Sequence, residues 1–119
     1  MSDLTREQIL SLSAGMDMDA LIAERVFKQC PPSPSEMVRL RRLGAWSCDR
    51  YSVDANAMMQ VIENRRQAGY DLTARWRPKL FDWWVDFQDK DGFSNASYGC
   101  DDLILSVCRA ALLTTLEEA

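Results

Sequence analysis

The segment Leu80–Gln88, LFDWWVDFQ, carries the clearest pattern of hydrophobic and polar positions in the chain. In a β-strand, successive side chains point to opposite faces. One face of this segment is then wholly apolar and consists of Phe81, Trp83, Val85 and Phe87. The opposite face is mixed and consists of Leu80, Asp82, Trp84 and Asp86. The pattern predicts the middle strand of a sheet, covered completely on one side and partly on the other.

Weaker alternation on both sides of this segment predicts two further strands. Residues 70–77 alternate between apolar and polar, and Pro78 ends the pattern. Asp89–Gly92 has the composition of a turn, and the more polar stretch Phe93–Tyr98 suits a strand at the edge of the sheet. The chain therefore predicts a three-stranded antiparallel meander.

Two helices are predicted before the strands by their capping residues and apolar stripes. Thr5 and Gln8 have the spacing of a capping box at the start of a short helix over residues 6–12. Asp17 is the expected N-cap of the next helix, which stops before Pro31. Its apolar stripe consists of Met18, Leu21, Ile22 and Val26.

Two longer helices are predicted around the strands. Ser52 is the expected cap of a helix that runs to about Gln67 and stops at Gly69. Its inward positions are Val53, Ala57, Met58, Val61 and Ile62, and its outward positions are Glu63, Arg65 and Arg66. Asp101 is the expected cap of the last helix, the best cover for the apolar face of the sheet. Its stripe consists of Leu103, Ile104, Val107, Cys108, Ala111 and Leu112.

Together these elements predict an α/β (α+β) fold in a single domain over residues 1–119. The three-stranded antiparallel sheet lies between helices on both faces, as an α/β/α sandwich. Residues 30–50 read as an inserted basic segment, in which a short helix up to Gly44 carries Arg39 and Arg42. A solvated surface is the favoured interpretation of these arginines, with an anion site as the alternative.

Composition narrows the function classes. A net charge of −4 opposes general nucleic-acid binding. The four cysteines form no CxxC pair and the chain has no histidine, so we expect reduced thiols and no zinc site. The first residues resemble no signal peptide, and no segment reaches the length of a membrane helix. We therefore expect a cytoplasmic protein that does not associate with membranes.

Three segments together resemble conserved blocks of the phage ABA sandwich domain family. They are GMDMDALIAERV at Gly15–Val26, YSVD at Tyr51–Asp54 and VCRAAL at Val107–Leu112, in the family's order and rough spacing. The resemblance implies an α/β/α sandwich and an origin in a tailed phage or prophage. It brings no established catalytic residues. The chain departs from the family pattern at Phe27–Gln29, where relatives continue with Gly-Trp, and in its longer basic insert.

Catalytic groups are scarce in this sequence. Without histidine, the chain lacks the commonest general base and the usual serine or cysteine triad. Carboxylates near the strand and helix ends leave a divalent-metal-dependent enzyme as the least favoured hypothesis. Turn and cap roles explain most of these aspartates, and Asp82 and Asp86 are expected to face solvent. We expect no enzymatic activity and no cofactor.

The basic segment Arg75–Lys79 is the best candidate site. On a strand, Arg75 and Arg77 share a face with Lys79 in line, and Trp84 on the neighbouring strand can stack beneath a guanidinium or a base. Cross-strand ion pairs with Asp82 and Asp86 are the favoured explanation, and a phosphate-binding face is the alternative. Trp83 is expected in the core.

The functional hypothesis is a non-enzymatic phage or prophage accessory protein that acts by binding. Its first form is an inhibitor of a host defence or regulatory protein. The alternative is a sponge that sequesters a nucleotide or another small anionic ligand. A homodimer is the default expectation for the assembly.

Overall fold

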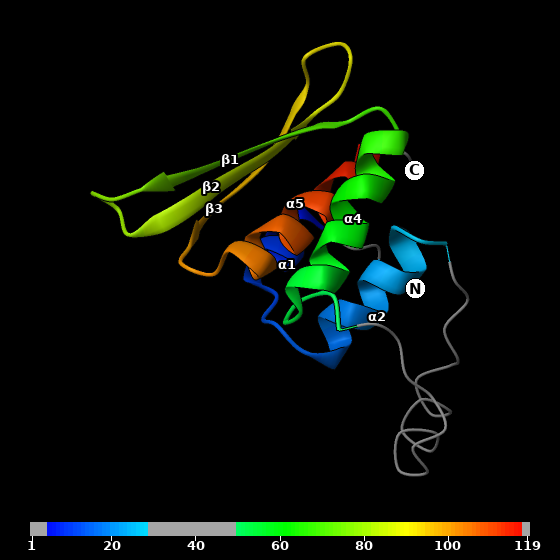
Figure 1. Ribbon diagram of the computed structural model, residues 1–119, viewed down its shortest axis with the longest axis horizontal. Helices are drawn as coiled ribbons and strands as arrows, with labels where there is room; N and C mark the ends of the chain where they lie inside the picture. The colour runs from blue at the N-terminus through cyan, green and yellow to red at the C-terminus, as the bar shows by residue number, and fades with distance from the viewer. Residues whose placement is uncertain (1–4, 29–49, 118–119) are drawn as a thin grey trace.

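The computed structural model describes residues 5–28 and 50–117 (Figure 1). Two helices precede the gap, namely α1 (Arg6–Ser11) and α2 (Met16–Arg25). After the gap follow α4 (Ala55–Gln67), β1 (Asp71–Arg77), β2 (Asp82–Gln88), β3 (Ser94–Cys100) and α5 (Leu103–Glu117). Most of the basic insert, with Arg39 and Arg42, lies outside the described residues.

The three strands form one antiparallel sheet in the order β1-β2-β3, as predicted. The middle strand, β2, contributes Val85 and Phe87 to the core, where both side chains are completely buried. Phe81 was expected beside them but is 75% exposed. It lies in the turn before the strand, with a φ of +52° that ends the alternation.

Helix α5 is buried on almost every side. Its residues 105–108 and 110–115 are all inaccessible to solvent or nearly so. It packs against β2 and β3 on one side and against α1, α2 and α4 on others. A helix with apolar side chains around most of its circumference must be enclosed in this way, and Ser106, Thr114 and Thr115 are buried with them. The predicted cover of the sheet by the last helix is therefore confirmed.

The predicted mixed α/β domain, with a three-stranded antiparallel sheet flanked by helices, is confirmed. Helices were expected on both faces of the sheet, whereas all described helices lie on one side of it (Figure 1). The layers run from the sheet through α5 to the remaining helices. The helices gather on this side because α5 exposes apolar side chains in several directions, against which α1, α2 and α4 bury their own apolar residues. The far face of the sheet stays open among the described residues.

The sequence located most helix starts to within two residues. The capping box of α1 is confirmed, because the Thr5 hydroxyl accepts from the Gln8 N–H and the Gln8 side chain accepts from the Thr5 N–H. Asp54, not Ser52, caps α4 by accepting from the Asn56 N–H at 2.8 Å. The N-cap of α2 is Gly15, not the predicted Asp17. The N-cap of α5 is Asp102, not the predicted Asp101.

Ser52 is not a cap because its polar groups are used in a buried junction. Both its backbone N–H and its hydroxyl donate to Oδ1 of Asp19, at 2.8 and 2.7 Å. The hydroxyl oxygen in turn accepts from the Gly15 N–H at 2.9 Å. Asp19 and Ser52 are both buried. This junction fixes the start of α2 against the segment that leads into α4.

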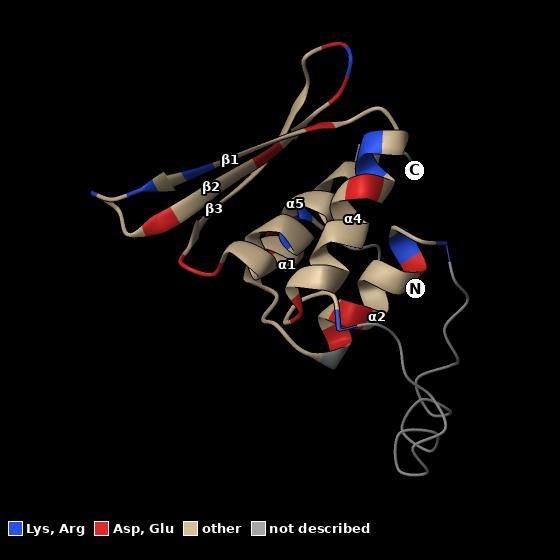
Figure 2. Cartoon of the chain, in the orientation of Figure 1, with Lys and Arg blue, Asp and Glu red and all other residues tan. Residues whose placement is uncertain are grey.

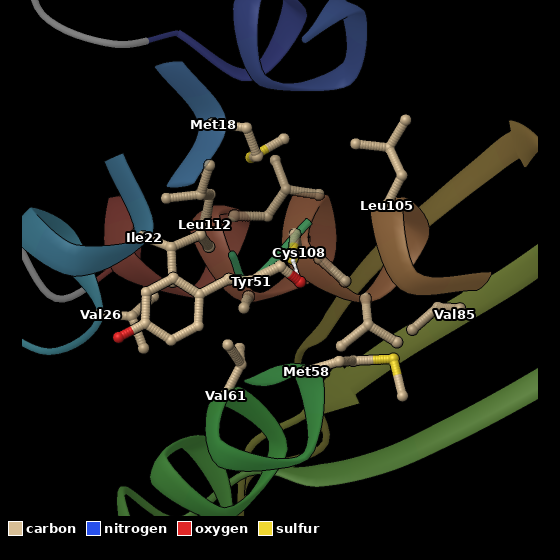
Figure 3. Packing of buried hydrophobic residues seen from close by; sticks show 14 of the residues in the cluster. Met18, Ile22, Val26, Tyr51, Met58, Val61, Val85, Leu105, Cys108 and Leu112 are labelled. Atoms are coloured by element: carbon tan, nitrogen blue, oxygen red, sulfur yellow. Dashed lines mark hydrogen bonds between the residues drawn. The ribbon is translucent and has the colours of Figure 1, made fainter. Parts of the chain in front are cut away.

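Helix α5 is tied to the same region by two further contacts. The thiol of Cys108 donates to the Tyr51 carbonyl oxygen at 3.3 Å, among the apolar side chains of α2 and α4 (Figure 3). The Arg109 guanidinium donates to the Leu12 carbonyl oxygen at 2.9 Å through Nε. The three segments of the family resemblance therefore meet inside the protein, where they hold helices together.

Burial on α4 differs from the prediction at two positions. Ala57, Met58 and Val61 are buried as predicted, but Val53 precedes the helix and is exposed. Arg65, expected to face water, is only 3% exposed. Its guanidinium donates to Thr114 of α5 at 3.1 Å and lies 5.7 Å from the centre of the Tyr70 ring. Arg65 thereby links the end of α4 to α5 and to the entrance of β1.

Replacing Ser52 with alanine should destabilise the protein by about 2 kcal/mol, because the buried Asp19 carboxylate loses a hydroxyl donor that the surrounding core cannot replace. Urea unfolding followed by circular dichroism would measure the loss. Ser13→Ala, at an exposed serine in the connection between α1 and α2, is the matched control and should change stability little. Equal effects of the two substitutions would contradict the role assigned to the junction.

Candidate functional site

The open face of the sheet carries the residues predicted as the binding site. We call it the outer face, and by register it carries Thr73, Arg75, Arg77, Asp82, Trp84, Asp86 and Tyr98. The register sets Arg75 opposite Trp84 and Arg77 opposite Asp82. Figure 2 shows basic positions along β1 and an acidic position at the start of β2. The sheet therefore brings together Arg75, Arg77 and Trp84, as the sequence indicated.

Arg77 is committed to an ion pair with Asp82. Its Nε donates to Oδ1 at 2.7 Å, and its Nη2 donates to Oδ2. The Gly99 N–H donates to the same Oδ2 at 2.8 Å. The hydrogen bond from Arg77 is the main cause that lowers the pKa of Asp82 below its ordinary value. The same bond raises the pKa of Arg77, so the pair remains ionised in neutral solution.

Arg75 is held by an aromatic ring instead of a carboxylate. Its guanidinium carbon lies 5.6 Å from the centre of the Trp84 ring, within the range of a cation–π interaction. Arg75 is exposed, and Trp84 is half-buried. No carboxylate among the described residues pairs with Arg75. Arg75 is thus a charged group on the outer face that has no ion-pair partner among the described residues.

Tyr98 is a member of the outer face that the sequence analysis missed. It is 55% exposed, and the Arg77 guanidinium carbon lies 5.8 Å from the centre of its ring. The register between β2 and β3 shifts between Trp83 and Val85, so Tyr98 and Gly99 together oppose Trp84. This β-bulge, at which Gly99 has a φ of +81°, sets the position of Tyr98. Gly99 was the only sequence signal for it.

The remaining predicted residues are placed differently. Lys79 is exposed but lies in the turn after β1, so it does not continue the line of the strand. Asp82 and Asp86, expected to face solvent, are both buried. Asp86 opposes Thr73, not an arginine, and accepts from the Asn95 N–H at 2.8 Å. Only one of the two predicted cross-strand ion pairs is therefore present.

The described part of the chain shows neither a metal-binding cluster nor an activated Cys108 thiol. No group of three or more acidic or cysteine side chains there could hold a metal ion. Burial, and then the charges of Asp19 and Asp102, raise the pKa of the Cys108 thiol to about 12. A thiol with this pKa is almost entirely protonated in neutral solution and is a poor nucleophile. Cys108 is a packing residue, in agreement with the prediction.

A shallow depression on α4 does not provide a general base. Its volume is about 400 Å³, and its lining consists of Phe27, Met59, Gln60, Glu63, Asn64 and Gln67. Hydrogen bonds from Arg66 and then Gln67 lower the pKa of Glu63 to about 2. The only carboxylate in the lining is therefore too weak a base for proton transfer at neutral pH.

Comparisons with protein-family models, curated proteins and solved structures found no match to this chain. The resemblance to the phage ABA sandwich domain thus rests on the sequence motifs alone. None of the helices in residues 5–28 and 50–117 combines the length and apolarity needed to cross a membrane.

The ion pair on the outer face predicts a pH dependence of stability. Because the pKa of Asp82 is lower in the folded state, its stabilisation is complete above the ordinary value of 3.8 and is lost as pH falls through the folded value. Asp82→Asn should therefore be less stable than the wild type near neutrality, and the difference should shrink in acid. Urea unfolding at a series of pH values would measure this difference.

Asp101→Asn is the matched control, since it removes an exposed carboxylate outside the sheet. A difference between wild type and Asp82→Asn that stays constant into strong acid would contradict the assigned ion pair.

Proposed function

We propose that this protein acts by binding a partner protein through its outer face, without catalysing a reaction. The observation that carries the proposal is Arg75. Its guanidinium is exposed, is supported by the Trp84 ring and has no carboxylate partner among the described residues. An arginine in this state can donate hydrogen bonds to a carboxylate of another molecule and form an ion pair with it.

The side chains around Arg75 suit a protein interface. Tryptophan, tyrosine and arginine dominate the residues that contribute most to binding between proteins. Trp84 and Tyr98 lie on neighbouring strands, and Tyr98 contacts Arg77. Both arginines are already stacked on rings, so binding would cost little additional side-chain entropy. The outer face is thus organised before a partner arrives.

Charge defines the chemistry of the partner. The charge of Arg77 is neutralised by Asp82, whereas neither Arg75 nor the turn residue Lys79 forms an ion pair with a described residue. The complementary surface should therefore present carboxylates at the positions of Arg75 and Lys79, around an apolar or aromatic centre. Contacts of this kind direct association and weaken with added salt.

The family resemblance supports a bacterial host protein as the partner. A phage or prophage accessory protein of this kind would work in the host cytoplasm and would inhibit a defence or regulatory protein by covering its surface. The sponge for a nucleotide is less favoured, because Asp82 already neutralises the charge of Arg77 and its carboxylate would repel a phosphate placed beside it. A metal-dependent enzyme is the least favoured alternative.

An Arg75→Ala/Tyr98→Ala double variant should lose at least about tenfold in affinity for the partner, because truncation of central interface residues costs more than 1 kcal/mol each at hot spots. Affinity purification from a lysate of the bacterial host, with mass spectrometry, would identify the partner. Titration of the purified partner against wild type and variant would measure the change.

Lys90→Ala is the matched control, because it removes one exposed positive charge from the β2–β3 turn, away from Arg75. The control should bind like the wild type. A partner that binds the double variant unchanged would place the interface elsewhere. Stabilisation of the wild type by a nucleotide in a thermal-shift assay, lost in Arg75→Ala, would favour the sponge instead.

A further inference from the structure

Strand β1 forms an edge of the sheet that is open to pairing. It pairs only with β2 among the described residues, in a regular register over all seven of its residues. It contains neither proline nor glycine, and most of its residues are exposed. The backbone N–H and C=O groups along its free side are therefore available to a further strand.

The opposite edge of the sheet is protected. β3 contains the bulge at Gly99, which interrupts a straight run of backbone groups. In addition, Arg6 of α1 donates to the Ala96 carbonyl oxygen at 3.4 Å. Bulges and covering elements are the usual means by which proteins block edge strands. Among the described residues β1 has neither a bulge nor a covering contact on its free side, so the two edges differ in their capacity for association.

We propose that two copies of this chain pair through β1, antiparallel, about a two-fold axis at Ala74. The two sheets then become one sheet of six strands. Backbone groups that point out of an edge strand belong to alternate residues, so the axis must pass through a residue position and not between two. Among such registers, the one centred on Ala74 is the only one that pairs all seven residues of each strand.

The side chains are self-complementary in this register. Asp71 lies opposite Arg77 of the partner subunit, which sets unlike charges together at both ends of the pair. Leu72 lies opposite Trp76 of the partner subunit, on the face of the sheet that carries the core. Trp76 is 40% exposed in a single copy, so pairing gives an aromatic ring new apolar contact.

Neighbouring registers lose these advantages. An axis at Arg75 would set Arg75 directly opposite Arg75 of the partner subunit, and like charges in that position are destabilising. An axis at Thr73 would leave Trp76 and Arg77 without strand residues opposite them. The sequence of β1 therefore favours one symmetric register over both alternatives.

Sedimentation velocity over a concentration series tests the association. Wild type should show a reversible dimer whose fraction rises with concentration. Ala74→Glu should raise the dissociation constant at least about threefold, because two carboxylates then meet at the axis. Ala74 is exposed in the single copy, so the substitution should leave the fold intact by circular dichroism. Ser94→Glu, at an exposed position on β3, is the control and should associate like the wild type.

A cysteine scan tests the register. At the axis the two Cα atoms should lie about 4.5–5.5 Å apart, within the range of a disulfide. Ala74→Cys should therefore form a covalent dimer in a glutathione redox buffer. Thr73→Cys and Arg75→Cys should form far less, because like residues at these positions would lie about 8 Å apart. The wild type, treated in the same buffer, is the control for cross-linking through the native cysteines.

A monomer at all concentrations up to about 1 mM would overturn the proposal. Unchanged association of Ala74→Glu, or strongest cross-linking at position 73 or 75, would overturn the register. No partner protein is present in these experiments, so their outcome is independent of the proposed function.

Discussion

The enclosure of α5 is the constraint on which the rest of the structure depends. A helix with apolar side chains around most of its circumference cannot rest on a sheet and leave its back in water. α1, α2 and α4 therefore pack around it, and the sheet covers the remaining side. Among the described residues, α5 covers the inner face of the sheet and three helices cover α5, so the outer face carries no helical layer.

Local patterns were sufficient to predict the strands and most helix stripes. Alternation in the segment that ends at Gln88 identified the central strand, because burial of one face imposes a period of two on any sequence. Helix starts were less certain, since several aspartates and serines lie close together and each can cap. Ser52 could not be assigned correctly, because its partner Asp19 lies 33 positions away in the chain. Arg65 escaped prediction for a similar reason, as Thr114 is 49 positions away.

The candidate site was predictable where it depends on one hairpin. Arg75, Arg77 and Trp84 belong to neighbouring strands joined by a short turn, so their register follows from the chain itself. Tyr98 depends on a bulge, and a one-residue irregularity moves a side chain between faces without a strong sequence signal. The burial of Asp82 was also missed, because it results from Arg77 and Gly99 closing over the carboxylate.

Only one face of the sheet packs on α5, and under the proposed function the other face binds the partner, which has an evolutionary consequence. Under the proposed function, substitutions at Thr73, Arg75 or Tyr98 would alter recognition without changing the face of the sheet that packs on α5. Selection could therefore redesign the recognition surface rapidly while the folding core stayed constant. Descendants of this chain could differ widely in their targets and still share one architecture.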